Sequence, residues 1–311
     1  MLSDLKMNEK GLDNQGWKDS WDGIVDGQGD LVAPPVALVE VQGYIYAAKI
    51  AIAEVFEDLG EADRAKSLRK EAAKLRATIE ERFWHRSLYG MALNGVSELP
   101  PAVASNAGHL LWSGVPSRQR GKKQVERLMR SDMFSGWGIR TLTSNSSRFN
   151  PIGYHTGTVW PHDNALILAG FKRYGAEDAL NTAAQGLFEA ALTFPYFRLP
   201  ELLGGSPRRQ HQAPVPYPVA CRPHAFAAAA LPSILWSILG LVPDAPNGRL
   251  HLVRPHLPSW LNTVELSRLR VGGSSIDLTF HRSGGRTEVE VVDSDGIDVV
   301  QTDRWPDLTA A

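Results

Sequence analysis

The sequence predicts an all-α fold, a two-layer helical toroid over residues 1–245, with a small antiparallel β segment over residues 246–311. Three observations lead to this expectation. Apolar stretches alternate with charged, one-sided stretches along the first part of the chain, and long loops rich in glycine, proline and tryptophan separate them. After residue 245 the pattern changes to short alternating segments bounded by turn residues, which is typical of strands.

The predicted helices differ in character along the chain. Four segments are apolar on nearly every face, which is typical of helices buried on two sides: residues 36–56, 102–113, 159–174 and 221–241. Three others are charged and carry a single apolar stripe: residues 61–84, 119–131 and 177–193. In the expected arrangement each buried helix is covered by its charged neighbour, which produces two layers.

The predicted strands follow in the last part of the chain. Five segments alternate apolar and polar residues, with turn residues such as GGSS, SGGR and DSDG between them: residues 250–255, 263–271, 274–282, 287–293 and 297–303. This alternation predicts antiparallel strands with one covered face. The loops at 132–158 and 194–220 are longer than about 12–15 residues, a length that is usually functional in a compact domain.

Composition excludes several classes of protein. The chain has 311 residues, with 33 Lys and Arg against 34 Asp and Glu, so no basic surface for nucleic acid is expected. The one cysteine, Cys221, cannot form a disulfide within the chain, and we expect it to be buried. No apolar leader and no long apolar span are visible. We therefore expect a cytoplasmic protein with no nucleic acid and no membrane as partners.

The common motifs of cofactor and metal sites are missing from the sequence. HEXXH, paired CxxC, GxGxxG, GxxxxGK[ST] and GxSxG do not occur. His155, His162 and Asp163 could form a metal site, but His162 and Asp163 are adjacent and point in different directions on a helix. We expect no cofactor and no metal, and sugar hydrogen bonding or helix capping is the favoured role for these side chains.

Carboxylates framed by aromatic residues occur in four loops: GWKDSWD at 16–22, NPIGYHTGTVWPHDN at 150–164, RLPELLGG at 198–205 and PVPYPVACRPHAF at 214–226. Sugar rings stack their apolar faces on Trp and Tyr, and their hydroxyls pair with Asp, Glu, His and Asn. Cleavage of a glycosidic bond needs two carboxyl groups. Asp19 and Glu201 are the natural pair, since both lie in Trp-, Pro- or Gly-containing loops.

These loops carry a family resemblance. GWKDSWD, ALVEVQGYIYAA, SNAGHLLWSG, DMFSGWGIRTL, NPIGYHTGTVWPHDNA, LPELLGG and PVPYPVACRPHA occur in this order between about residue 12 and residue 245. Together they resemble the C-terminal part of the amylo-α-1,6-glucosidase, or glycogen debranching enzyme-like, glycoside hydrolases of the six-hairpin glycosidase superfamily. The resemblance implies an (α/α)6 toroid as the catalytic domain and carbohydrate as the substrate.

The resemblance also implies roles for individual residues. Hydrolysis of an α-glucosidic linkage, including α-1,6, would proceed by inversion, with Asp19 as the general acid and Glu201 as the general base. Asp22 is the rival acid, and its favoured role is that of a helix N-cap or a supporting hydrogen-bond partner. Glu40 is either a satisfied buried carboxylate or a partner of a sugar hydroxyl that orients Asp19. The substrate-binding residues would be Trp17, Trp21, Asp22, Glu40, Tyr154, His155, Trp160, His162 and Tyr217.

The chain departs from the family pattern in its length. It contains about seven predicted helices, fewer than a toroid of six helical hairpins requires, and the proposed acid lies near its start. We therefore expect a toroid that is incomplete at the N-terminus and exposes apolar helix faces. The alternative function is a catalytically impaired fragment or carbohydrate-binding subunit that needs an upstream partner chain or a second copy of itself.

Overall fold

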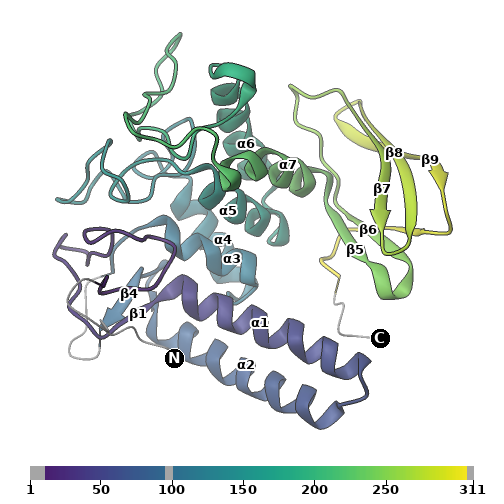
Figure 1. Cartoon of the computed structure of the whole chain (residues 1–311), viewed down its shortest axis with the longest axis horizontal. Coiled ribbons are helices and arrows are strands. Elements are labelled where there is room, and N and C mark those ends of the chain that lie inside the picture. The colour runs from purple at the N-terminus through teal and green to yellow at the C-terminus, as the bar shows by residue number, and fades with distance from the viewer. Residues whose placement is uncertain (1–10, 95–100, 307–311) are drawn as a thin grey trace. The chain divides into compact units, whose positions relative to one another are not determined.

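The computed structural model describes residues 11–94 and 101–306 (Figure 1). The chain divides into two compact units, Met1–Leu231 and Pro232–Ala311. The functional division at residue 245 stays a prediction, because these units follow from packing and not from activity. No helix in the described part of the chain is long and apolar enough to cross a membrane.

The first unit is built mainly from helices and the loops that join them. Its α-helices are α1 (Val39–Asp58), α2 (Ala62–Arg82), α3 (His109–Ser113), α4 (Arg118–Leu128), α5 (Pro161–Arg173) and α6 (Glu177–Ala191), and α7 (Ala225–Leu239) begins in this unit. Short 3₁₀ turns lie at Ser105–Gly108 and Pro195–Phe197. Helices α1 and α2 form a hairpin of two neighbouring rods (Figure 1).

The short helix α3 is the centre of this unit, because α1 and α5 both pack against it. Glycines allow the close approach. A Cβ at Gly170 of α5 would lie 2.7 Å from the Trp112 backbone nitrogen, and a Cβ at Gly43 of α1 would lie 2.9 Å from Leu110 Cδ2. Leu110 is fully buried here with Val39, Ile79 and other side chains of α1 and α2.

Two small antiparallel sheets lie beside these helices. Strand β1 (Val36–Leu38) pairs with β4 (Ala92–Asn94), and β2 (Trp84–His85) pairs with β3 (Leu88–Tyr89). Strand β1 runs directly into α1, so the sheet fixes the start of that helix. A second apolar cluster packs around β1 and β4 and supports the loop that follows Trp17; it comprises Ile24, Val25, Val32, Val36, Leu38, Met91, Ala102, Ala104 and Leu142.

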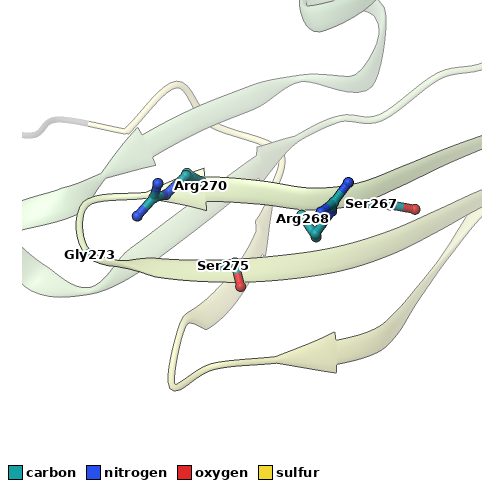
Figure 2. Close-up of a pocket in the computed structure, with 5 residues that line it drawn as sticks. All are labelled: Ser267, Arg268, Arg270, Gly273 and Ser275. Atoms are coloured by element: carbon teal, nitrogen blue, oxygen red, sulfur yellow. The ribbon is translucent and has the colours of Figure 1, made fainter.

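The second unit contains two three-stranded sheets and a 3₁₀ turn, Ala245–Asn247. In one, β6 (Arg249–Val253) pairs antiparallel with β5 (Leu241–Asp244) and parallel with β10 (Asp298–Thr302). The other is antiparallel and has the order β7 (Thr263–Val271), β8 (Ser274–Ser283), β9 (Arg286–Ser294). A bulge interrupts the pairing of β7 with β8. Figure 2 shows a pocket on the β7–β8 hairpin, lined by Ser267, Arg268, Arg270, Gly273 and Ser275.

The prediction of an all-α fold, including the (α/α)6 toroid, is wrong. The described residues form seven α-helices and ten strands in four sheets, which is a mixed α/β structure. The helices lie where the apolar periodicity predicted them. Strands of two to four residues, such as those within 84–94, are too short to show alternation, so the sequence pattern missed them. The sheet β10–β6–β5 also differs from the prediction of antiparallel strands, because β10 pairs with β6 in parallel.

Burial of the apolar helices was overestimated as well. In the predicted segment 36–56, Ile52 and Val55 are 48% and 50% exposed, and the buried residues of α1 are those of its first turns and Ala53. In the predicted segment 221–241, Phe226 is 66% exposed. A helix with apolar residues on every face can be buried on every side. Its sequence does not show whether other elements actually cover each face.

The contact of α3 with its two neighbours generates a paired prediction. Alanine at either helical glycine should gain about 1 kcal/mol of helix propensity. At Gly170 the new methyl group would meet the backbone of α3, which cannot move unless the whole helix moves. Overpacking of this kind costs about 1–3 kcal/mol of stability. At Gly43 the methyl group would meet the ends of side chains, which can rotate away.

We therefore expect Gly170→Ala to lower the urea midpoint and Gly43→Ala to leave it near the wild-type value. Tryptophan fluorescence during urea unfolding measures both. Equal midpoints for the two variants would show that α3 is not held as tightly as these contacts require.

Candidate functional site

Four segments that are distant in sequence are joined side by side by single β-bridges. The bridges link Arg140 to Val159, Val159 to Leu203, and Leu203 to Pro216. Reciprocal backbone hydrogen bonds of 2.9 and 2.8 Å join Val159 and Leu203. The loops predicted to carry tyrosine, histidine and glutamate are therefore held in one place by backbone pairing, although none of them forms a regular sheet.

The loop containing Trp17 and Asp19 joins this group through its neighbours. Ser20 Oγ lies 2.9 Å from His155 Nδ1, so the loop is tied to the 150–160 segment. A Cβ at Gly23 would lie within 3.3 Å of both His155 Cβ and Lys18 Cβ, so the loop turns back tightly on itself. Lys18 points inward and is fully buried, whereas the Asp19 side chain is 72% exposed.

Trp17 is the centre of an aromatic cluster. Its ring centroid lies 5.3 Å from that of His155, 5.8 Å from Trp160 and 5.4 Å from His162, all in edge-to-face contact. His155 stacks on Trp160 at 4.8 Å. Edge-to-face and stacked contacts at these distances stabilise one fixed arrangement of the rings. The cluster therefore forms a rigid wall beside the Asp19 loop.

Asp19 lies at the exposed edge of this wall. Its Oδ1 is 3.7 Å from His155 Nε2. Burial lowers the pKa of His155 to about 2, and the charges of Lys18 and His162 act in the same direction. The imidazole of His155 is therefore neutral at ordinary pH. A neutral imidazole can form a hydrogen bond with Asp19 or with a ligand, but it does not form a permanent ion pair with the Asp19 carboxylate.

Glu201 is held inside the site by three neighbours. The Tyr154 hydroxyl donates to Oε1 at 2.8 Å, the Cys221 backbone N–H donates to Oε2 at 3.2 Å, and His224 Nε2 lies 3.9 Å from Oε1. Burial and the neighbouring Glu201 carboxylate raise the pKa of Tyr154, so its hydroxyl keeps the proton that it donates. Cys221 is exposed, so the expectation that it would be buried is wrong.

A buried polar network lies on the other side of Trp17. Tyr44 Oη is 2.5 Å from His109 Nδ1, and His109 Nε2 is 2.7 Å from Asp163 Oδ1. Because an ionised carboxylate only accepts, His109 donates from Nε2 and its Nδ1 accepts from Tyr44. Asn106 Nδ2 donates to Glu40 Oε1 at 2.9 Å, and burial raises the pKa of Glu40.

Several buried polar atoms in and around this cluster have no hydrogen-bond partner among the described residues. They are Trp17 Nε1, Glu40 Oε2, Asn106 Oδ1, His155 Nε2, His162 Nδ1 and Asp163 Oδ2. Buried polar groups in native proteins are nearly always paired, with protein, water or ligand. Donors and acceptors gathered beside aromatic rings have the chemistry that a polyhydroxylated ligand needs.

The structure brings most of the predicted site residues together. Tyr154 links the two carboxylates, because it bonds Glu201 and its ring lies 4.5 Å from that of His155, the neighbour of Asp19. The Tyr217 ring lies 5.8 Å from Tyr154. Glu40 joins the site through its contact with the Trp17 loop, since a Cβ at Gly16 would lie 2.7 Å from Glu40 Oε1.

Two predicted residues make no ring contact or side-chain hydrogen bond with the Trp17 cluster in the part of the chain that the structure describes. Trp21 is 74% exposed and takes no part in the ring contacts of the Trp17 cluster among the described residues. Asp22 is half-buried and acts on the buried Lys18 through its charge, and its supporting role stays a prediction. No cluster of three or more His, Cys, Asp or Glu side chains suited to a metal ion occurs in the described ranges 11–94 and 101–306.

Sequence reasoning missed several members of the site. Tyr44, Asn106, His109 and His224 were not among the predicted site residues, whereas sugar hydrogen bonding or helix capping was the favoured role of Asp163. The available signal was their position: Asn106 and His109 are three residues apart, which places both side chains on one helical face. That face meets the fully buried carboxylates of Glu40 and Asp163.

Comparisons with known proteins identify a family and a set of structures with a similar fold. Residues 7–197 match the mannosylglycerate hydrolase MGH1-like glycoside hydrolase domain. No curated protein matches the chain. A sialidase of known structure superposes with a TM-score of 0.61 at 14% identity, over 91% of this chain and 27% of that one.

Two other solved structures are similar in fold. The GH63 mannosylglycerate hydrolase from Thermus thermophilus, solved with Tris, gives a TM-score of 0.52 at 16% identity over 65% of this chain and 45% of that one. Neutral trehalase Nth1 from Saccharomyces cerevisiae gives 0.55 at 15% identity, over 70% and 41%. The chain thus spans less than half the length of these structures, and identities this low show the fold alone.

The predicted relationship to the six-hairpin glycosidases is supported at family level, while the match contains no evidence on debranching. The matched region includes the Asp19 loop, the Trp17 cluster and the buried network, and ends just before Glu201. Because this match covers more than half of the sequence, the chain belongs to the MGH1-like glycoside hydrolase domain family.

Proposed function

We propose that the chain hydrolyses α-glucosidic linkages of the glycogen-debranching type, including α-1,6 linkages, by inversion. Asp19 is the general acid that protonates the leaving oxygen, and Glu201 is the general base that activates water. The observation that carries the proposal is the position of Tyr154 and His155 between these two carboxylates. The pair of carboxyl groups that glycoside hydrolysis requires thus flanks one aromatic wall.

The surroundings of Glu201 support its role as the base. Two donors, Tyr154 Oη and the Cys221 N–H, converge on the two carboxylate oxygens. They fix the plane of the carboxylate, and Oε1 also lies near His224. A water bound at this carboxylate would have a defined direction of attack, which is what a general base needs in addition to its basicity.

The cluster of aromatic and polar side chains around Trp17 supports a sugar as the ligand. An apolar ring face can lie against the aromatic wall, and the unpaired atoms of Glu40, Asp163 and His162 can pair with hydroxyls. The network Tyr44–His109–Asp163 holds one of these carboxylates in place. Substrate-binding roles for Trp17, Tyr154, His155, Trp160 and Tyr217 follow from the same arrangement, and Trp21 and Asp22 would contact only parts of the substrate outside the pocket.

A carbohydrate-binding subunit without turnover is the second candidate. The 72% exposure of the Asp19 side chain favours it, because a general acid open to water is poorly shielded. In that case a separate upstream chain or a second copy would cover Asp19 and complete the site. An assay with maltooligosaccharides, branched glucan and mannosylglycerate distinguishes the two candidates, since binding without hydrolysis supports only the second. If mannosylglycerate is hydrolysed and the two glucans are not, mannosylglycerate would replace the α-glucosides as the proposed substrate.

The two proposed catalytic carboxylates generate the first functional prediction. Asp19→Asn and Glu201→Gln should each lower kcat by about 10²–10⁴-fold, because each removes one proton-transfer group. Both changes keep the side-chain shape, so the unfolding temperature should stay near that of the wild type. Release of reducing sugar from maltooligosaccharides measures kcat.

Two variants of the same loop provide the comparison. Asp22→Asn should lower kcat less than Asp19→Asn, and Asp30→Asn, on an exposed carboxylate away from the site, should leave kcat unchanged. A larger loss in Asp22→Asn than in Asp19→Asn would transfer the acid role to Asp22. Turnover near the wild-type rate in Glu201→Gln would remove Glu201 from the mechanism.

The stereochemistry of the product tests inversion directly. Water attacks the face opposite the leaving group, so an α-glucoside should release β-glucose first. Proton NMR of the anomeric signals during the first minutes, before mutarotation, records this anomer. Initial release of α-glucose would show a retaining reaction and would make one carboxylate a nucleophile.

The buried histidines generate a prediction on pH. His155 and His162 have lowered pKa values, chiefly through burial, whereas in the unfolded chain histidine titrates near 6.5. Below about pH 6.5 the unfolded state therefore binds protons that the folded state does not, and stability falls as the pH falls, by up to about 1.4 kcal/mol per pH unit for each histidine. This loss begins above the range in which most carboxylates titrate.

The free energy of unfolding in urea should thus fall as the pH is lowered from about 7 to about 5. This window includes the titration of unfolded histidine and stays above that of most carboxylates. His155→Gln should reduce the slope, because it removes one of the two protons. His211→Asn is the control: it removes an exposed histidine with a positive φ that Asn tolerates. An unchanged slope in His155→Gln would mean that this imidazole is charged in the folded protein.

A further inference from the structure

His224 directly precedes helix α7, and its side chain caps that helix. Its backbone oxygen accepts from the Ala228 N–H at 2.9 Å, and its Nδ1 accepts from the Ala227 N–H at 3.4 Å. Because a backbone N–H only donates, Nδ1 acts as the acceptor and has no proton. The imidazole therefore has its proton on Nε2, and this second nitrogen is a donor.

The donor of His224 faces the proposed base. Its Nε2 lies 3.9 Å from Glu201 Oε1. This distance is longer than the usual N–H···O range of about 2.7–3.2 Å, so the two groups do not bond each other directly. The Phe226 ring packs edge-to-face against the imidazole, with the centroids 5.9 Å apart, and helps to hold its direction. A donor and a carboxylate oxygen thus lie side by side, and neither uses the hydrogen-bonding capacity of the other.

Glu201 Oε1 can accept one more hydrogen bond. A carboxylate oxygen has two lone pairs, and the Tyr154 hydroxyl donates to one of them at 2.8 Å. Two hydrogen bonds of about 2.8 Å that meet at one water can span the 3.9 Å between Nε2 and Oε1. A water at this point accepts from His224 and donates to Glu201. His224 is only half-buried, so water can reach it.

We propose that His224 is a further catalytic residue, which contacts the attacking water and orients it together with Glu201. The inference rests on the proposed function, because it takes Glu201 as the general base. In the hydrolytic step the water oxygen bonds to the anomeric carbon and gives one proton to Glu201. The glycosidic bond breaks, and the leaving oxygen takes the proton of Asp19. His224 keeps its own proton: it occupies one lone pair of the water and leaves the other for attack on the sugar.

Helix capping alone does not account for a histidine at this position. Ser, Thr, Asp and Asn are the preferred N-cap residues, and a short side chain is enough to accept from the Ala227 N–H. Imidazole differs from these side chains because it has a second nitrogen on the far side of the ring. In His224 that nitrogen is the one that faces the Glu201 carboxylate.

Two substitutions separate the cap from the donor. In His224→Asn the side-chain oxygen can still accept from the Ala227 N–H, but the side chain ends before the position of Nε2. In His224→Gln the longer side chain can place an amide N–H near that position, but glutamine is not a preferred N-cap residue.

We expect His224→Asn to keep the unfolding temperature and the KM of the wild type and to lower kcat about 10²-fold, the loss that misplacing a reacting group by about 1 Å can cause. We expect His224→Gln to lower the unfolding temperature and to retain most of kcat. Release of reducing sugar measures kcat and KM, and circular dichroism during heating measures unfolding. If His224→Asn turns over at the wild-type rate, His224 is only a cap and the inference is overturned.

The leaving group shows on which side of the scissile bond His224 acts. Fluoride leaves α-glucosyl fluoride with little help from an acid, so this substrate should restore turnover in Asp19→Asn. It should not restore turnover in His224→Asn or Glu201→Gln, because both residues act on the water. A fluoride electrode measures the release. Recovery of His224→Asn on this substrate would assign His224 to the leaving group and overturn the inference.

The wild type separates failure of the inference from failure of the proposed function. If the wild type is active, Glu201→Gln is inactive and His224→Asn is fully active, only the inference is overturned. A wild type that releases neither reducing sugar nor fluoride overturns the proposed function and the inference with it. A wild type that hydrolyses only mannosylglycerate contradicts the proposed substrate; loss of kcat on it in His224→Asn but not in His224→Gln then supports the inference.

Discussion

The neutralisation of buried charge is the constraint on which the site depends. Lys18, Glu40, His109 and Asp163 are all fully buried, and none of these groups could be ionised there alone without a large loss of stability. They come from the first loop, α1, α3 and α5. Each element must therefore be in place for the others to be stable, and this buried network forms as part of the folding of the first unit.

Precision in the loops comes from backbone pairing at single residues. Val159 and Leu203 bond each other reciprocally, and a Cβ at Gly205 would lie 1.7 Å from the Gly157 oxygen, so the two chains touch. Arg140, 1% exposed, donates to the Gly205 oxygen at 2.5 Å and to the Ser131 oxygen at 2.9 Å. These contacts fix long loops that would otherwise be mobile, and they fix Glu201 with them.

Prediction from the sequence succeeded where the pattern was long and local. The helices and the β7–β9 hairpins have enough residues for their periodicity to be read. The Asp19, Tyr154–Trp160 and Glu201 loops lie together in the structure, and their role as one site stays a prediction. The short pairs β1–β4 and β2–β3 and the parallel contact of β10 with β6 depend on partners distant in the chain, so no local pattern could predict them. The same is true of the contact between Lys18 and the Thr141 backbone oxygen, which lie far apart in the sequence.

The backbone of Cys221 both donates to the Glu201 carboxylate and accepts from the Glu201 N–H at 3.1 Å, while the residue itself is exposed. It is also the only cysteine in the sequence. A fluorophore or spin label attached through its sulfur would therefore sit at a single known point, beside the backbone that holds the proposed base, without any engineered cysteine. Changes in its signal on addition of carbohydrate would report the local state of the Glu201 loop in real time.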